Sequence, residues 1–569
     1  MANANAAIYY HPDGFDTATR MMGRQAAGEA LLRALARDEK FGPVIGAVDG
    51  PNNEHAMRRQ FAALGGDAAR LSIVMARDQA ALAKIGCLMR PDPILAAEVW
   101  RRHRRPGNAA YSLCGLTHTV ASKGPADGLG EFMLAPNERW DAIICTSLSV
   151  RRVMERMIDS YCDYLRERFG ANMRPRFELP VIPLGVNCAD FTPQAMAPHR
   201  ARLRGQLGIG EQDFTALFLG RLSYHAKANP VPMMQALELC ARASGQPVHF
   251  IMAGSFFSEG IGQAFRAAPA QFCPSVRCHF LDGRDADIRA HVWAAADVFL
   301  SLVDNIQETF GLAPLEAMAA SLPVVVSDWD GYRETVRDGQ DGFLIPTLMS
   351  APGSAADLAA SFADDSINYD RYIAAASNLV SVDASAAALA LQRLAGDPSL
   401  RRQMGAAGRA RALADFDWPV VLRAWQALWA DLAQRRGAAA AAATDKAGKP
   451  HPLHFDPTLL FADYAHAYLD GSARLSLQPG WTQAAIDAAI ASPMFSHSAT
   501  LLLAPGDIAA IANAVAGQPG LSLQALGAML PQISQRRCLR GAMLLSKVGA
   551  LRVEDATLNA TKPPPLGKA

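Results

Sequence analysis

Short apolar runs rich in β-branched residues alternate with longer segments of helical periodicity through about residue 400. This alternation is typical of parallel sheets whose strands are joined by crossover helices. The apolar runs predict strands at 7–10, 44–48, 71–75, 109–113, 142–146 and 181–183, and then at 215–219, 249–253, 277–281, 298–302, 324–327 and 343–345. We therefore expect two consecutive α/β units. Their boundary is expected near residues 187–193, where the chain becomes polar and contains proline.

The pattern changes after the second unit. Residues 415–419 offer an aspartate cap and a proline for the first turn of a helix that continues to about Gln434. An alanine-rich run at 437–450 predicts a linker or an extension of that helix. Helical patterns follow at 482–490, 506–515, 523–529 and 535–545, with little that is typical of a parallel sheet. We therefore expect a mainly α-helical module over residues 451–569.

The composition is that of a globular protein, because half of the 569 residues are apolar and only 19% are charged. Lys and Arg number 55 against 54 Asp and Glu, so no global field favours nucleic acid as a partner. The nine cysteines are scattered and odd in number, which indicates reduced thiols in a cytoplasmic protein. No leader or membrane-spanning apolar run is evident, although peripheral membrane contact through an amphipathic face stays open.

The most informative segment is SLVDNIQETFGLAPLE, residues 301–316. A strand ends at Leu302, and Gly311 with Pro314 predicts that a helix begins at the carboxyl end of that strand. A helix start presents free N–H groups and a positive dipole end, which favour a phosphate or diphosphate. Glu308 before the helix and Glu316 within it are suited to accept hydrogen bonds from ribose or sugar hydroxyls. Solvated glutamates beside an ordinary turn are the alternative.

A second motif places two cations after a predicted strand. The strand ends in Gly220-Arg221-Leu222, and Lys227 follows in the same loop. Ligands of open α/β folds collect at this edge of the sheet. Arg grips phosphate oxygens with a planar fork and Lys adds a mobile charge, which suits a departing nucleoside diphosphate. Taken alone, the motif is more often a structural turn with a surface salt bridge.

These motifs, together with Ala253-Gly254, Gly331–Glu334 and Gly342-Phe343-Leu344, resemble family 4 retaining glycosyltransferases of the GT-B fold. The resemblance covers roughly residues 1 to 435, strongly in the second unit and loosely in the first. It implies two Rossmann-like domains that face each other across a cleft. It also implies an acceptor-side domain at 1–192, a nucleotide-sugar donor domain at 193–414, a helix returning to the first domain at 415–436, a linker at 437–450 and a helical accessory module at 451–569.

The resemblance carries roles onto individual residues. It implies that Arg221 and Lys227 bind the donor diphosphate, that Glu316 holds the ribose hydroxyls and that Glu308 lies beside the transferred sugar. Further donor contacts are implied for Gly220, Gly254 and the backbone of Phe310, Gly311 and Leu312, with the base pocket around residues 281–283.

The first unit carries fewer of the family's features. His118 follows a strand, where the family has a histidine against the donor sugar, although a loop hydrogen-bonder is the alternative. The family's glycine-rich loop corresponds to residues 11–16, which retain only Gly14, so Asp13 or Asp16 is expected to face the acceptor. Alanine rather than glycine follows Lys227, which is a second departure.

The triplet Asp328-Trp329-Asp330 has the form of a metal-binding motif of other glycosyltransferases. We reject that role, because it lies just before Gly331 and the Arg–Lys pair already supplies the charge of a metal. No other cluster of His, Cys and Asp shows ligand spacing along the sequence. We expect no metal requirement and no cofactor beyond the sugar nucleotide as substrate.

The resemblance implies a retaining glycosyltransferase of the hexosyltransferase type, acting from a nucleoside-diphosphate sugar on an acceptor hydroxyl. The alternatives are a sugar-nucleotide epimerase or a phosphorylase on the same scaffold, or a non-catalytic sugar-nucleotide sensor. An epimerase needs a base poised at a sugar carbon, for which the sequence offers no candidate. The acceptor stays open between a glycan, a lipid, a protein and a small molecule. Acceptor recognition or oligomerisation is the expected role of residues 451–569.

Overall fold

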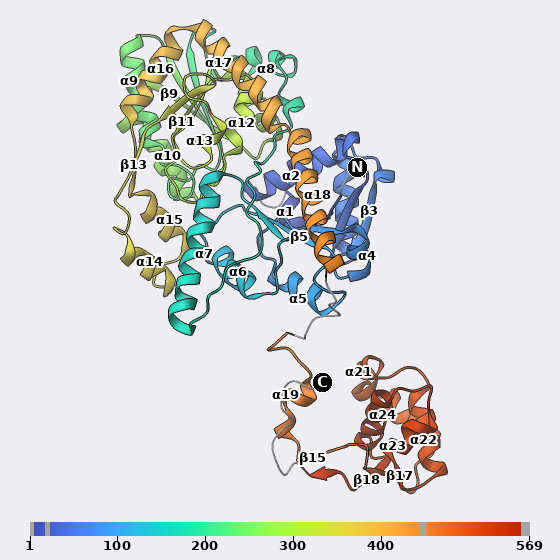
Figure 1. The fold of residues 1–569 in the computed structure, drawn as a ribbon. Coiled ribbons are helices and arrows are strands. Elements are labelled where there is room, and N and C mark those ends of the chain that lie inside the picture. The colour runs from blue at the N-terminus through green and yellow to red at the C-terminus, as the bar shows by residue number, and fades with distance from the viewer. Residues whose placement is uncertain (1–4, 18–22, 443–450, 559–569) are drawn as a thin grey trace. The chain divides into compact units, whose positions relative to one another are not determined.

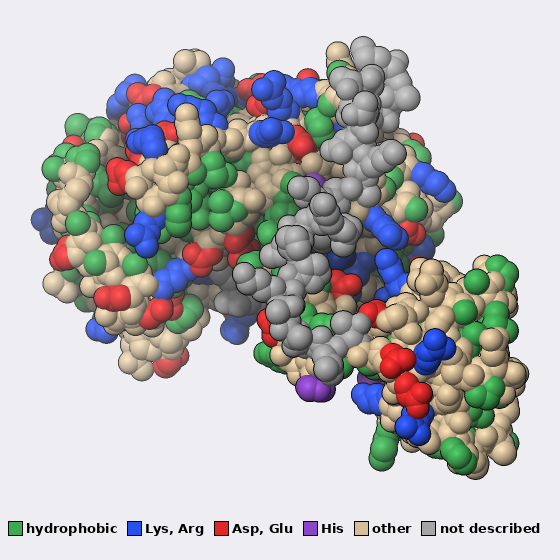
Figure 2. Space-filling model, turned by 60° about the horizontal axis from the view of Figure 1, so that its bottom comes forward, with side chains coloured by type: hydrophobic (Ala, Val, Ile, Leu, Met, Phe, Trp, Pro, Cys, Tyr) green, Lys and Arg blue, Asp and Glu red, His purple; other side chains and the backbone are tan. Residues whose placement is uncertain are grey.

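The computed structural model describes residues 5–17, 23–442 and 451–558. The chain forms two compact units, residues 1–449 and 450–569 (Figure 1). On the face drawn in Figure 2, the described basic and acidic side chains are interspersed. This agrees with the near-equal numbers of basic and acidic residues in the sequence, 55 Lys and Arg against 54 Asp and Glu. The first unit contains two six-stranded sheets, and each is built from parallel strands.

The first sheet has the strand order β3-β2-β1-β4-β5-β6. Its buried strands lie between helices on both faces, which explains why they read as continuous apolar runs. The strands are β1 (Ala7–Tyr9), β2 (Val44–Val48), β3 (Leu71–Met75), β4 (Cys87–Met89), β5 (Ser112–Leu116) and β6 (Ala142–Ile144). The helices are α1 (Pro12–Phe15), α2 (Gly23–Arg37), α3 (Pro51–Ala63), α4 (Gln79–Ile85), α5 (Ala96–Arg104), α6 (Lys123–Leu134) and α7 (Leu148–Phe169).

The second sheet has the order β12-β11-β10-β7-β8-β9. Its strands are β7 (Phe214–Leu219), β8 (Val248–Gly254), β9 (Val276–Asp282), β10 (Val298–Ser301), β11 (Val324–Ser327) and β12 (Gly342–Ile345). The helices are α8 (Pro193–Gln206), α9 (Val231–Ser244), α10 (Glu259–Phe272), α11 (Ala286–His291), α12 (Leu312–Ala319), α13 (Tyr332–Thr335), α14 (Ala356–Ala363), α15 (Tyr369–Ser377), α16 (Ala384–Gly396) and α17 (Pro398–Arg411). A short antiparallel pair, β13 (Thr347–Met349) and β14 (Val380–Val382), stands outside this sheet.

The two Rossmann-like sheets confirm the predicted fold class, GT-B with an additional C-terminal unit. All six strands expected in the second sheet are present. In the first sheet β5 begins later than expected, and residues 181–183 form only an isolated bridge between Cys145 and Val181. The short strand β4 was missed, because three residues carry too little periodicity to be recognised.

Helix α18 (Trp418–Ala442) packs against the first sheet although it follows the second in sequence. Its Trp418, Trp425 and Trp429 are buried, and Arg436 donates a 2.7 Å hydrogen bond to the Ser112 hydroxyl of β5. The helix continues past the predicted end at residue 436, because alanine has the highest helix propensity. The rest of the predicted linker, residues 443–450, lies outside the described part of the chain.

The second compact unit is mainly helical, as expected. It contains α19 (Pro457–Leu460), α20 (Gln483–Ala491), α21 (Pro493–Leu502), α22 (Asp507–Gly517), α23 (Leu523–Met529) and α24 (Gln535–Lys547). An antiparallel sheet of order β17-β16-β18 accompanies them, from β17 (Leu521–Ser522), β16 (Arg474–Leu477) and β18 (Leu551–Glu554), beside the pair β15 (Ala467–Tyr468) and β19 (Thr557–Leu558). Buried apolar side chains such as Leu475, Ile511 and Leu545 form its core.

Within the described residues, no single helix is long and apolar enough to cross a bilayer. The pair α21 and α22 passes the test of length and composition when taken together, but the two helices are bent by 95° at their junction.

Candidate functional site

The site is centred on the loops that follow β7 and β10, which are neighbours in the second sheet. One loop carries Arg221 and Lys227, and the other carries Glu308 before α12. Because parallel strands end at the same edge of a sheet, these loops converge. The structure therefore brings together the two cations and the first glutamate that the sequence singled out.

Lys227 and Glu308 form a direct ion pair between the ammonium group and carboxylate oxygen Oε2. Burial alone would raise the pKa of Glu308, but Lys227 and the backbone N–H groups of Thr309 and Phe310 hold it below its ordinary value. The carboxylate is therefore ionised at neutral pH, and the start of α12 already hydrogen-bonds to negative charge. This is the kind of environment that a phosphate oxygen would also find favourable.

Arg221 lies in the loop after β7, which also carries Lys227. Its guanidinium group donates to the side-chain oxygen of Gln307 and, over 2.9 Å, to the backbone oxygen of Ala226. Arg221 is therefore held close to the residue that precedes Glu308. Both cations reach the β10 loop, so a diphosphate bound there would meet two positive charges.

Helix α12 begins at Gly311, whose φ of 90° lies in the left-handed region. A Cβ atom at this position would lie 1.9 Å from the Cε1 atom of Tyr332, which is fully buried. Glycine is therefore required both by backbone conformation and by the close approach of Tyr332. As at any helix start, the first backbone N–H groups of α12 have no partner within the helix.

Glycines also mark the ends of β7 and β8. A Cβ atom on Gly254 would lie 1.8 Å from the backbone oxygen of Gly220, so the two strand ends pack backbone against backbone. A Cβ atom on Gly283, after β9, would lie 2.7 Å from the Cα atom of Gly254. The predicted donor contacts Gly220 and Gly254 and the predicted base pocket near residue 283 are thus adjacent in space.

Glu316 lies within α12, as expected. Burial raises the pKa of Glu316 to about 7, and the nearby charge of Lys227 opposes that rise. A carboxyl group near half-protonation at neutral pH is poised to accept a hydrogen bond from a hydroxyl once a ligand enters. This perturbed pKa is consistent with a site residue but does not by itself identify the ligand.

The raised pKa of Glu316 makes stability depend on pH. The folded state retains a proton between pH 4.5 and about 7 that the unfolded chain loses, so stability falls as pH rises through this window. Between pH 5 and pH 8, Glu316 should lower the free energy of unfolding of the wild type by about 2–3 kcal/mol. Glu316→Gln should not show this decrease. Urea unfolding at both pH values measures the difference. The exposed Glu39 provides the control, since Glu39→Gln should parallel the wild type.

The first sheet contributes His118, which follows β5. Burial first, and then the charge of Arg24, lowers the pKa of His118 to about 4, so the imidazole is neutral at pH 7. Its Nε2 atom is buried and has no hydrogen-bond partner among the residues that the structure describes. Such an atom is costly to leave unsatisfied unless a ligand or water meets it. This favours the functional interpretation of His118 over that of a satisfied loop residue.

The loop at residues 11–16 holds the remaining predicted residues. The backbone oxygen of Asp13 accepts hydrogen bonds from Arg24 and Gln25 at 3.0 and 2.8 Å, while the Asp13 side chain is exposed. Gly14 is buried against α2, and Asp16 ends helix α1. Asp13 is therefore available to solvent and to an acceptor, whereas Gly14 has a packing role.

Several side chains that the sequence did not single out connect the two sheets. Gln307 donates a 2.9 Å hydrogen bond to the Tyr369 hydroxyl of α15, which lies 3.5 Å from the Thr119 hydroxyl beside His118. Arg221 and the His118 loop are thus linked through Gln307 and Tyr369. The position of Gln307 next to Glu308 was a signal for its involvement, whereas no local pattern marked Tyr369 or Arg24.

A second connection is made by the motif Gly331–Glu334. The carboxylate of Glu334 accepts hydrogen bonds from the backbone N–H of Leu148 at 2.7 and 2.9 Å and of Ser149 at 3.3 Å. These groups form the N-terminus of α7, where a negative charge is favourable. A residue of the second sheet's domain therefore caps a helix of the first sheet's domain.

The triplet Asp328-Trp329-Asp330 does not present two carboxylates to one point. Asp328 pairs with Arg333 at 2.9 Å, whereas Asp330 accepts a 3.3 Å hydrogen bond from the Ser147 hydroxyl. Burial raises the pKa of Asp330 to about 8, so it is largely protonated at neutral pH. Partners of this kind agree with the rejection of a metal-binding role for the triplet.

Comparison with known proteins extends these observations. Residues 199–379 match the family model described as glycosyl transferases group 1. A D-inositol 3-phosphate glycosyltransferase of Nocardia farcinica is 30% identical over 196 residues, which are 34% of this chain and 41% of that protein. A phosphatidyl-myo-inositol mannosyltransferase of Mycobacterium leprae is 32% identical over 200 residues, 35% of this chain and 48% of that protein. The chain spans less than half the length of these curated relatives.

Among solved structures, a glycosyltransferase from Rickettsia africae aligns with 75% of this chain and 99% of its own, at 13% identity and a TM-score of 0.48. A similarity at this level carries no argument about substrates. The family match covers all six strands of the second sheet and helices α9 to α15, a region that holds Arg221, Lys227, Glu308 and Glu316.

Proposed function

We propose that this chain, whose residues 199–379 match the model of the glycosyl transferases group 1 family, transfers a sugar from a nucleoside-diphosphate sugar to an acceptor hydroxyl. The observation that supports this most directly is the convergence of Arg221, Lys227 and the start of α12 at one edge of the second sheet. Two cations beside a row of backbone N–H groups suit a diphosphate.

In this proposal the protein works by positioning and by charge. Arg221, Lys227 and the N–H groups of Phe310, Gly311 and Leu312 stabilise the diphosphate as its bond to the anomeric carbon breaks. Glu316 accepts hydrogen bonds from the ribose, and Glu308 lies beside the sugar. No side chain serves as a nucleophile, and the acceptor proton passes to the departing phosphate. The sugar is transferred with retention of configuration and without a metal ion.

The acceptor-side sheet supplies His118 and Asp13. The neutral imidazole of His118, with its unpartnered Nε2 atom, is suited to hydrogen-bond to the transferred sugar. The exposed carboxylate of Asp13 is suited to orient an acceptor hydroxyl. The relatives named above act on inositol phosphate or phosphatidylinositol acceptors by their names, but the family match does not extend to this sheet. The acceptor class therefore stays open between glycan, lipid, protein and small molecule.

We place the reaction in the cytoplasm, since sugar nucleotides are made there and the nine cysteines are free thiols in the structure. The C-terminal unit, residues 450–569, has its own core and is proposed to recognise the acceptor or to mediate self-association.

A panel of sugar nucleotides tests the proposal. The full chain is incubated with UDP-, GDP-, ADP- and TDP-sugars, and both thermal stability and nucleoside diphosphate release are measured. We expect one base to raise the melting temperature by several degrees, because a ligand at 100 times its Kd adds about 2.7 kcal/mol. The same donor should release nucleoside diphosphate when a hydroxyl acceptor is added. Binding without release would support a sensor instead, and interconversion of the sugar an epimerase.

A further inference from the structure

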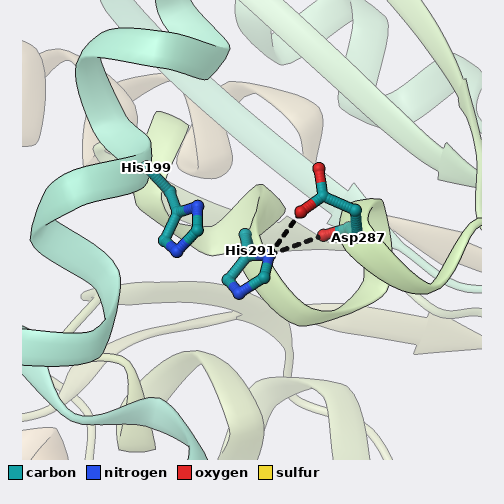
Figure 3. A group of neighbouring side chains, drawn as sticks. All are labelled: His199, Asp287 and His291. Atoms are coloured by element: carbon teal, nitrogen blue, oxygen red, sulfur yellow. Dashed lines mark hydrogen bonds and ion pairs between the residues drawn. The ribbon is translucent and has the colours of Figure 1, made fainter.

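Three metal-binding side chains lie together on the donor-side part of the chain. His199 is on α8, and Asp287 and His291 are one helical turn apart on α11 (Figure 3). One ligand atom from each lies within 4.8 Å of the others. Figure 3 shows the two histidine rings projecting from their separate helices into the same space, with Asp287 beside His291. These residues take no part in the proposed sugar transfer.

We propose that His199, Asp287 and His291 bind one divalent ion of the zinc class. Two imidazoles and one carboxylate form a ligand set that zinc, cobalt and nickel accept, with water completing the coordination. Asp287 and His291 are spaced at i and i+4, which places both side chains on one face of α11. His199 adds a ligand from a second helix, so the ion would bridge α8 and α11.

The present geometry shows what must move when the ion binds. The His199 and His291 rings are stacked, with their centroids 3.6 Å apart and their planes at 13°. A metal must lie in the plane of each imidazole, so the rings have to splay apart. The change is rotation about χ2, a soft torsion for histidine. The Nδ1 atom of His291 lies 2.8 Å from a carboxylate oxygen of Asp287, so an ion shared by the two residues would replace this hydrogen bond and bind at Nδ1.

Arg202 is the group that competes with the ion. Its guanidinium group lies 2.9 Å from the Asp287 carboxylate and 3.1 Å from Nδ1 of His199. Arg202 therefore already supplies positive charge where the ion would sit. The ion has to displace it from Asp287, which predicts that removing Arg202 strengthens metal binding. This is a specific signature of the site that a random surface histidine would not show.

The ion would also affect the donor pocket. Arg289 of α11 donates hydrogen bonds to the backbone oxygens of Gly283 and Arg284, at 3.3 and 2.8 Å. These residues form the loop after β9 that lies beside Gly254. Fixing α11 against α8 would therefore fix this loop. That consequence rests on the proposed function, whereas the binding of the ion does not.

Calorimetric titration of the full chain with Zn²⁺, and absorption spectra with Co²⁺, test the proposal. We expect one ion per chain, with a spectrum of nitrogen and oxygen ligands. His199→Ala and His291→Ala should each weaken binding at least tenfold. Arg202→Met should tighten it severalfold, while His55→Ala, at an exposed histidine in the first sheet's domain, should leave it unchanged. Unfolding in the presence of chelator verifies that all four variants fold as the wild type does.

Two results would overturn the assignment. One is wild-type affinity in both His199→Ala and His291→Ala, which would show that any bound ion lies elsewhere. The other is unchanged affinity in Arg202→Met, which would remove Asp287 from the ligand set. Because these measurements need no sugar nucleotide, they are independent of whether the chain proves to be a transferase.

Discussion

Replacing Lys227 with alanine should lower kcat/KM for sugar transfer by about 10²–10³-fold, the cost of removing one charged group from a developing leaving group. Lys227 is paired with the buried carboxylate of Glu308 at the carboxyl edge of the second sheet. Without the ammonium group, the diphosphate loses one of two cations and meets an uncompensated glutamate. Both effects oppose donor binding, so nucleotide affinity and turnover should fall together. Steady-state kinetics and calorimetric donor titration measure them.

A second variant separates loss of function from loss of folding. An unpaired buried carboxylate destabilises the fold, so Lys227→Ala alone should also unfold at lower denaturant concentration. Adding Glu308→Gln removes that charge and should restore stability without restoring turnover. Lys40→Ala is the matched control at an exposed lysine, and it should leave both properties unchanged. Full activity in Lys227→Ala would contradict the assigned role of Lys227.

Gly311→Ala should destabilise the fold by about 2–5 kcal/mol and abolish donor binding. An L-residue at a φ of 90° costs about 1–2 kcal/mol, and overpacking against the buried Tyr332 ring adds about 1–3 kcal/mol. Tyr332 has little room to yield, because its side chain is fully buried and its hydroxyl lies 3.3 Å from Ser301. The backbone at the start of α12 must therefore move to relieve the clash with Tyr332, and this movement misaligns the N–H groups of the helix start.

Chemical denaturation and donor titration of the same variant test both halves of this prediction. Gly124→Ala is the matched control, since Gly124 lies in α6 with nothing within 4 Å of its added Cβ atom. Alanine there should be neutral or stabilise by up to about 1 kcal/mol. If Gly311→Ala bound donor as the wild type does, the start of α12 would have no part in the site.

The second sheet could be predicted from sequence because its strands are apolar and separated by well-patterned helices. Valines 324, 325 and 326 illustrate this, since all three are fully buried in β11. The site loops were also predictable: Gly220-Arg221 and Gly311 mark the ends of neighbouring elements, and the topology of a parallel sheet brings such ends together. The first sheet was harder, because β4 is only three residues long and the run at 181–183 pairs through a single bridge.

What the sequence did not show are contacts between residues far apart in the chain. Tyr369 meets Gln307 and Thr119 only because α15 packs toward the first sheet. The His199, Asp287 and His291 cluster forms only because α8 lies against α11 and the segment after it. The protonation of Asp330 and the low pKa of His118 likewise depend on burial that arises in the folded state. Such features follow from tertiary packing rather than from local pattern.

The cap that Glu334 places on α7 has a consequence for motion between the two sheets. Any separation of the two sheets at this point would pull this carboxylate away from the amides of Leu148 and Ser149 and leave the positive end of the 22-residue helix to water. A charge at a helix terminus is worth about 0.3–1 kcal/mol when exposed and up to about 2 kcal/mol when partly buried. The Glu334 cap therefore favours the arrangement in which Glu334 and the start of α7 are in contact.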